Sequence, residues 1–138
     1  MNKKKQKTEK TKIETQDREI FVGENQLYLG EDNIIYVIRV GEADEEIATD
    51  ITNTGLKLAD LVNGKVKILA DLNKAGKSSS DARKIYQKHL KHNKFDKVAL
   101  YGLHPVARVI ATFGMGITKK KDVRFFKTKE EALLWLKE

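Results

Sequence analysis

The sequence contains no cysteine and a single proline among its 138 residues. Without thiols, the chain can form neither a disulfide nor a cysteine-based site for zinc or an iron–sulfur cluster, and no cysteine nucleophile is available. No apolar run reaches the roughly 20 residues that cross a bilayer. The lysine-rich start is not followed by the apolar stretch of a secretory signal. These absences predict a cytoplasmic protein without a membrane span.

The composition is that of one soluble domain. Hydrophobic residues make up 40% of the chain and charged residues 34%. A chain near this length buries roughly 68% of the surface of its unfolded state, so its core needs no disulfide or structural metal. We expect a single domain that spans residues 18–138.

Residues 1–17 differ from the rest of the chain. This segment (MNKKKQKTEKTKIETQD) contains one large apolar residue, Ile13, and no apolar periodicity. It cannot bury enough surface to offset the entropy lost on ordering, so we expect a disordered basic tail. Its lysines suit contacts with phosphates, but no aromatic side chain accompanies them for base stacking.

The net charge of +7 is unevenly distributed. Residues 19–64 carry two basic and ten acidic side chains, whereas residues 65–138 carry eighteen basic and seven acidic ones. Such an uneven charge distribution makes nucleic acid, anionic lipid and a second copy of the chain, bound head to tail, candidate partners. The preferred interpretation is that the two halves interleave in space and neutralise one another.

Short strand-like segments that end at glycine make up the first part of the domain. Residues 19–22, 26–29 and 33–40 are rich in β-branched and aromatic side chains, which predicts a β-meander. A helix is predicted over residues 44–64, with acidic side chains in its first turn. Its apolar stripe includes Gly55, which indicates either close approach to the sheet or a local break.

The second part alternates between strands and helices. The expected strands are 66–72, 97–101 and 122–126, and the expected helices begin near Ser79 or Ser80, at Pro105 and after Thr128. Residues 73–78 (NKAGKS) are expected to form a loop. Alternation implies right-handed crossovers between parallel strands. The predicted fold class is therefore α/β: a mixed sheet with an N-terminal meander followed by βαβα units, with helices covering the sheet.

The helix predicted over residues 105–117 is apolar on nearly all sides. Between Val106 and Phe113, only Arg108 and Thr112 are polar. One face must pack on the sheet, and the other needs cover from the last helix, a partner subunit, a lipid-like ligand or a membrane surface. The candidate interface residues are Val106, Val109, Ile110 and Phe113.

The second part also carries a series of motifs in a familiar order. A strand ending in Asp71-Leu72, a Gly-Lys-Ser loop at 76–78 and Asp81-Ala82-Arg83 at a helix start precede a strand ending at Gly102 and the segment Val123-Arg124-Phe125-Phe126. This order resembles the bacterial STAS-like family (sulfate transporter and anti-sigma-factor antagonist), and in particular its small STAS/Sec14-like group, over roughly residues 20–138. The resemblance implies a STAS-like fold and a non-enzymatic regulatory or ligand-sensing module.

The resemblance also draws attention to Ser78, Ser79 and Ser80. Anti-sigma-factor antagonists are switched by phosphorylation of a serine, preceded by Asp, at the start of the helix after the central strand. Here the acid, Asp81, follows the serines, which departs from that order. Ser79 and Ser80 are interpreted either as phospho-acceptors or, preferably, as an N-cap and a residue of the first turn.

A second candidate site lies at the start of the helix predicted from Pro105. The free amides of that helix, with His104 and Arg108, would form a small anion site at the end of the preceding strand. The alternative is that His104 caps the helix and Arg108 is solvated. The three histidines lack the pattern of a metal site, and no nucleophile elbow or dinucleotide fingerprint is complete. No catalytic residue, metal or cofactor is expected.

Three functions remain open on the sequence. The leading hypothesis is a regulatory module without catalysis, which binds a protein partner or itself through the apolar helix 105–117 and the loop at Ser78–Ser80. The second is a binding module for a lipid-like or apolar anionic small molecule, with its head group at His104 and Arg108. The third is non-specific nucleic-acid binding through the lysine-rich tail and the basic half.

Overall fold

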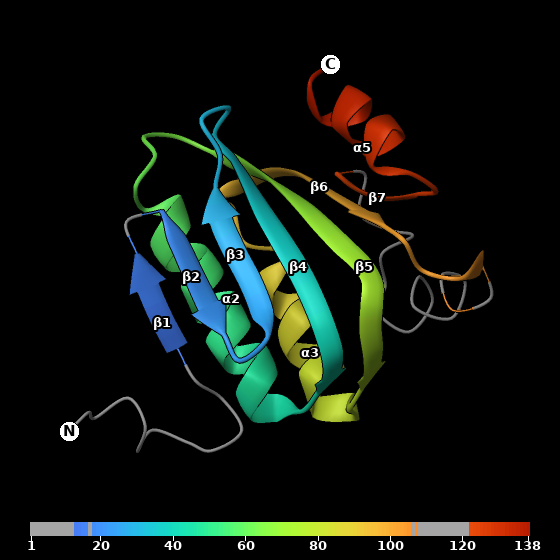
Figure 1. The fold of residues 1–138 in the computed structure, drawn as a ribbon. Coiled ribbons are helices and arrows are strands. Elements are labelled where there is room, and N and C mark those ends of the chain that lie inside the picture. Colours follow the sequence, from blue (N-terminus) through green and yellow to red (C-terminus); the bar gives the residue numbers. More distant parts are fainter. Residues whose placement is uncertain (1–12, 17, 106, 108–121) are drawn as a thin grey trace.

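The computed structural model describes residues 13–16, 18–105, 107 and 122–138. In these residues, seven strands form one sheet whose spatial order follows the chain (Figure 1). The strands are β1 (Ile13–Gln16), β2 (Glu19–Val22), β3 (Asn25–Leu29), β4 (Ile34–Ala43), β5 (Val66–Ser78), β6 (Phe95–Tyr101) and β7 (Val123–Phe126). The helices are α2 (Glu45–Ala59), α3 (Ser80–His89) and α5 (Lys129–Leu136).

The sheet is mixed, as the sequence predicted. The strands from β1 to β4 pair antiparallel, and those from β4 to β7 pair parallel. Parallel neighbours need a long connection, and α2 and α3 supply two of these connections. The α/β class, with a meander followed by βαβα units, is therefore confirmed.

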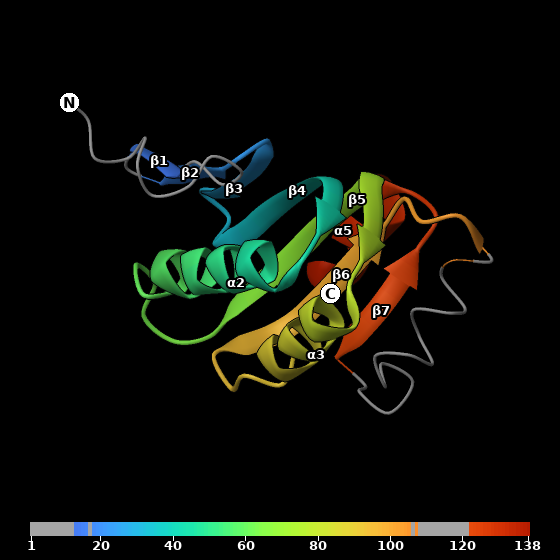
Figure 2. The same cartoon turned by 90° about the horizontal axis from the view of Figure 1, so that it is seen from below.

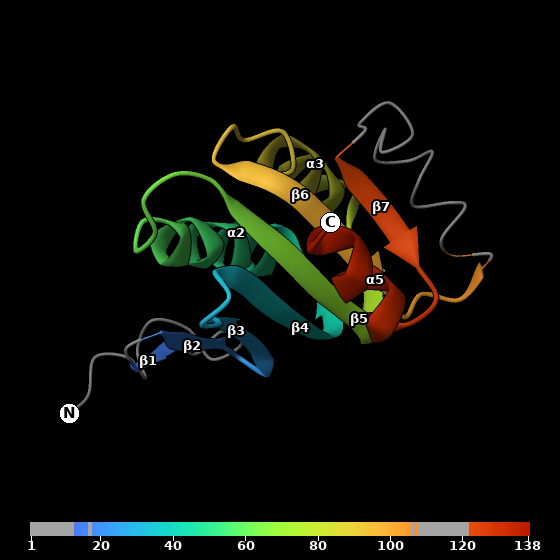
Figure 3. The same ribbon diagram turned by 90° about the horizontal axis from the view of Figure 1, so that it is seen from above.

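The two faces of the sheet carry different helices. Figures 2 and 3 show α2 and α3 on one side of the sheet and α5 on the other. Neighbouring residues of a strand point to opposite faces, so Ile68 packs in the cluster under α2, whereas Leu69 packs in the cluster under α5. Burial on both faces explains the apolar runs Ile68–Ala70 in β5 and Val98–Tyr101 in β6.

Aromatic and cationic contacts hold helix α5 against its face of the sheet. Its N-cap, Thr128, accepts a hydrogen bond from Glu131 N, as the sequence predicted. Lys97 Nζ donates to the carbonyl of Trp135 at 2.9 Å and lies 4.9 Å from the centre of the Trp135 ring. Lys67 Nζ donates to the carbonyl of Leu136 at 2.6 Å. These cations satisfy the carbonyl end of a helix that has no basic residue in its own last turn.

Three boundaries differ from the sequence-based expectation. Residues 13–16, expected within the tail, form β1 on the edge of β2, because adding a strand to an edge requires backbone pairing rather than an apolar pattern. Residues 73–78, expected as a loop, continue β5. They pair with the end of β4, where Ala43 lies opposite Ser78. Helix α2 ends at Ala59 rather than near Gly64, which leaves Leu61 exposed.

Gly55 lies inside a continuous α2 and faces α3 rather than the sheet. An added Cβ there would meet the ring of His89 at 3.6 Å, which is ordinary van der Waals contact. Neither sequence interpretation of this glycine, close approach to the sheet or a helix break, is correct. Gly102 is different: its φ is +99°, and an added Cβ would lie 2.8 Å from the backbone nitrogen of Asn73.

These two glycines predict opposite responses to alanine. Gly55→Ala is expected to stabilise the domain by up to about 1 kcal/mol, because alanine is the better helix former and the site has room. Gly102→Ala is expected to destabilise it by more than about 1 kcal/mol, because the backbone conformation and Asn73 both oppose a side chain. Urea unfolding of both variants measures this. A loss of stability in Gly55→Ala would contradict the assigned packing.

Candidate functional site

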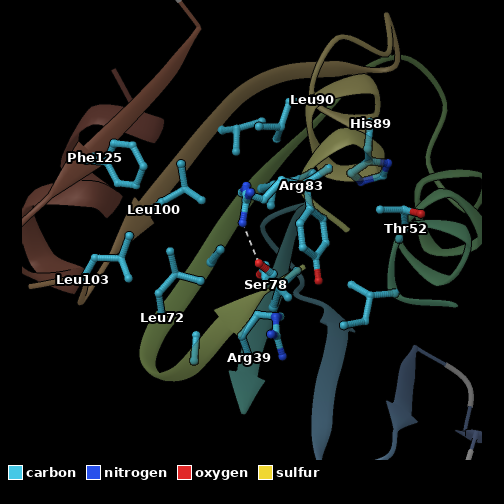
Figure 4. Close-up of a pocket in the computed structure, with 18 of the residues that line it drawn as sticks. Arg39, Thr52, Leu72, Ser78, Arg83, His89, Leu90, Leu100, Leu103 and Phe125 are labelled. Atoms are coloured by element: carbon cyan, nitrogen blue, oxygen red, sulfur yellow. Dashed lines mark hydrogen bonds between the residues drawn. The ribbon is translucent and has the colours of Figure 1, made fainter. Parts of the chain in front are cut away.

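A cavity of about 560 Å³ lies between the sheet and the helices α2 and α3 (Figure 4). Strand register builds its floor. Val37, Ala70, Leu100 and Phe125 lie opposite one another on the four parallel strands and all line the cavity. Ala70 is the small member of this row, so the floor has little side-chain volume at its centre.

Helix α3 roofs part of this space without filling it. Ala82 is its one fully buried side chain and packs with Ala43 and Ala48, where the starts of α2 and α3 meet the end of β4. Further along, Tyr86, His89 and Leu90 are partly buried and line the cavity. Small alanines thus hold the start of α3 close, and larger side chains hold the rest of the helix over the cavity.

Arg39 is a buried cation at the cavity wall. Its side chain is only 5% exposed and comes from β4. Its guanidinium donates to the side-chain oxygen of Asn25 and to the backbone carbonyls of Val40 and Gly41. Asn25 is itself fixed, because its amide donates to the carbonyl of Val22 at 3.0 Å. These three acceptors are all neutral oxygens, which orient the charge but do not neutralise it.

Two further titratable groups face the same cavity. The hydroxyl of Tyr86 is buried without a hydrogen-bond partner among the described residues. Burial raises the pKa of Tyr86, and Arg39 acts in the opposite direction through its charge and through a side-chain hydrogen-bonding interaction whose geometry is poor. Burial, followed by the nearby His92, lowers the pKa of His89 to about 4. His89 is therefore neutral near pH 7, and its ring packs edge-on against Phe95 at 4.8 Å between centroids.

The serines selected from the sequence lie at one end of the cavity. Ser79 is the N-cap of α3, and its hydroxyl accepts from Ala82 N at 3.0 Å. Ser80 is the first residue of the helix and is exposed. Ser78 ends β5 and lines the cavity, and its carbonyl accepts from the Arg83 guanidinium at 2.6 Å.

The second predicted site is only partly within the described chain. His104 is exposed between β6 and Pro105. Arg108, with the candidate interface residues Val106, Val109, Ile110 and Phe113, lies outside the described residues. Sequence reasoning missed Arg39, because a lone arginine in a strand resembles a surface residue. The available signal was its position inside the apolar run Ile34–Val40.

Neither a metal centre nor a spanning helix is found in the described parts of the chain. No group of three or more His, Asp or Glu side chains is placed to hold a metal ion there. None of the helices within the same ranges is long and apolar enough to cross a membrane.

The solved structures that the chain is similar to have the SpoIIAA-like fold. A DUF3478-family protein with this fold from Shewanella loihica PV-4 is 24% identical, with a TM-score of 0.59 over 81% of this chain and 91% of its own. The unphosphorylated anti-sigma factor antagonist SpoIIAA is 14% identical, with a TM-score of 0.58 over 80% and 94% of the two chains. Phosphorylated SpoIIAA, described as a Bacillus cell fate determinant, is 17% identical, with a TM-score of 0.54 over 80% and 97%.

The chain therefore has a SpoIIAA-like fold, in agreement with the fold that the resemblance to the STAS-like family implied. No curated protein sequence matches the chain. Residues 28–138 match the family described as Domain of unknown function (DUF7793), and the chain belongs to that family. The match begins in β3 and runs through α5, so it includes both Arg39 and Ser78–Ser80.

The lowered pKa of His89 predicts an acid-sensitive fold. The folded state binds a proton on His89 only near pH 4, whereas the unfolded chain binds it near 6.5. Stability is therefore fully present above about pH 6.5 and is lost as the pH falls toward 4, by up to about 3 kcal/mol. Urea unfolding at pH 7.5 and 5 measures the loss, which His89→Leu is expected to reduce. An equal loss in both proteins would assign the effect to other groups.

Proposed function

We propose that this protein is a non-enzymatic regulatory module that binds a protein partner through the surface where β5 ends and α3 begins. The observation that carries the proposal is the fold, which is similar to that of an anti-sigma factor antagonist over nearly the whole of that protein. SpoIIAA has been solved in unphosphorylated and phosphorylated forms. A modification switch is therefore part of the proposal for this chain as well.

The exposure and charge of this surface support the proposal. Lys77, Ser80, Arg83 and Lys84 are exposed around the start of α3. A helix start presents unpaired N–H groups, and basic side chains beside it favour an anionic group. A phosphate on Ser80 would be stabilised here, and it would change the charge of the surface that a partner meets.

Ser80 is a better acceptor than Ser79 in this arrangement. The hydroxyl of Ser79 is engaged as the cap of α3, and losing a serine cap typically costs about 1 kcal/mol. Ser80 begins the helix and faces solvent, so its modification leaves the cap intact. The proposed switch is therefore assigned to Ser80, with Ser79 as a structural cap.

Site-specific photo-crosslinking tests the partner surface. A crosslinking amino acid at Lys77 or Lys84 is expected to give one discrete adduct in the source cells, and Ser80→Glu is expected to reduce it at least fivefold while Ser80→Ala retains it. Leu134, which is 72% exposed on α5 at the opposite face, is the control position. Mass spectrometry of the Ser80 peptide reports phosphate. An equal yield of the same adduct from a crosslinker at Leu134, or an adduct yield that Ser80→Glu does not change, would count against the proposal.

Self-association through the apolar segment is a second part of the proposal. It rests on the sequence alone, because Val106, Val109, Ile110 and Phe113 lie outside the described residues. Val109→Asp and Phe113→Asp are expected to convert an oligomer into a folded monomer, as measured by sedimentation velocity and circular dichroism. A wild-type protein that is already monomeric, or variants that unfold, would refute this interface.

A further inference from the structure

The lining of the cavity is charged with one sign only. Among the described residues that line it, Arg39, Lys77 and Arg83 are basic and none is acidic. The remaining lining is mainly apolar, and the volume of about 560 Å³ lies within the range of small-molecule sites. An apolar space with an excess of positive charge is complementary to a molecule with an apolar body and one acidic group.

Arg39 has donors to spare for such a group. A guanidinium carries five N–H donors, and three hydrogen bonds from Arg39 are accounted for by Asn25, Val40 and Gly41. These bonds hold the side chain at the cavity wall, where it is 5% exposed. A buried cation that is held by three neutral acceptors gains most from a bound anion, because little water competes for it.

Tyr86 supplies an independent observation. Its buried hydroxyl makes no hydrogen bond of normal geometry in the described part of the chain, although the Arg39 side chain is close enough to interact with it, whereas buried hydroxyls are ordinarily fully satisfied. The charge of Arg39 acts on Tyr86, which places the two groups near each other. In Figure 4, Arg39 lies below Ser78 and Arg83, and Leu100, Leu103 and Phe125 lie to one side of these three residues. The basic and hydroxyl-bearing side chains thus lie beside an apolar part of the cavity lining.

We propose that this cavity binds an apolar monocarboxylic acid, with the carboxylate at Arg39 and Tyr86 and the hydrocarbon along Leu100, Leu103 and Phe125. This inference goes beyond the proposed partner surface and does not depend on it. It also relocates the head group that the sequence placed at His104 and Arg108. The acid binds as its anion, so charge recognition and apolar burial come from different walls of one cavity.

The chain itself contains a competing occupant. The segment between Gly102 and Asp122 joins β6 to β7, which are parallel neighbours. The strands β4 to β7 follow one another in a single direction across the sheet, and α2 and α3 lie on one face. Most of this segment lies outside the described residues, and it contains apolar side chains such as Val109 and Phe113. The experiment must therefore distinguish a bound acid from the apolar residues of this segment.

Titration of the intact protein with decanoate and with decan-1-ol separates charge recognition from apolar burial. Methyl NMR of Leu100 and Val98, together with calorimetry, reports binding inside the cavity. Decanoate is expected to bind at least tenfold more tightly than decan-1-ol and to shift the Leu100 methyls. Arg39→Gln is expected to abolish this preference while retaining weak binding of both compounds.

A second variant covers the case in which Arg39→Gln fails to fold. Ala70→Leu adds volume at the centre of the cavity floor without changing its charge. This variant is expected to bind decanoate and decan-1-ol at least fivefold more weakly than the wild-type protein does. Leu134→Ala, on the exposed side of α5, is the matched control and is expected to change neither affinity.

Three results would overturn the inference. The first is no decanoate binding up to its solubility limit. The second is equal affinity for the acid and the alcohol in the wild-type protein. The third is nuclear Overhauser contacts of Val109 or Phe113 with Leu100 and Phe125 that persist when decanoate is added. The last result would assign the cavity to the chain's own residues. Each would leave the crosslinking test at Lys77 and Ser80 unaffected.

Discussion

The parallel register of β4, β5, β6 and β7 is the constraint on which the rest of the structure depends. One row of residues, Ile35, Ile68, Val98 and Val123, is aligned across all four strands and is buried in the cluster that includes side chains of both α2 and α3. The next row on the same face forms the floor of the cavity. A shift of one residue in any strand would send its row to the α5 face and remove both the core and the cavity.

The long pairing of β4 with β5 connects this sheet to both proposed sites. The pair continues through a register shift to Ala43 and Ser78, well beyond the end of β6. It therefore carries Arg39 to the wall of the cavity and Ser78 to the start of α3. The proposed partner surface and the proposed small-molecule cavity thus share one structural support.

Local chemistry made several elements predictable. Thr128 caps α5 as the sequence pattern indicated, and Asp44 caps α2 by accepting from Ile47 N at 3.0 Å. The strands 19–22 and 66–72 follow from runs of β-branched and apolar residues. Residues 13–16 and 73–78 escaped prediction because their own side chains are mostly polar, and residues 73–78 also pair with the end of β4, which is distant in the sequence.

The class of fold and the position of the serines before α3 follow from the sequence, because caps, turns and apolar periodicity are local. The folded structure was needed to show that α5 covers the face opposite α2 and α3, that Gly55 faces the ring of His89, and that Arg39 is buried near Tyr86. These facts depend on strand register and helix placement, which bring together residues far apart in the chain. The chemistry of the cavity exists only after that assembly.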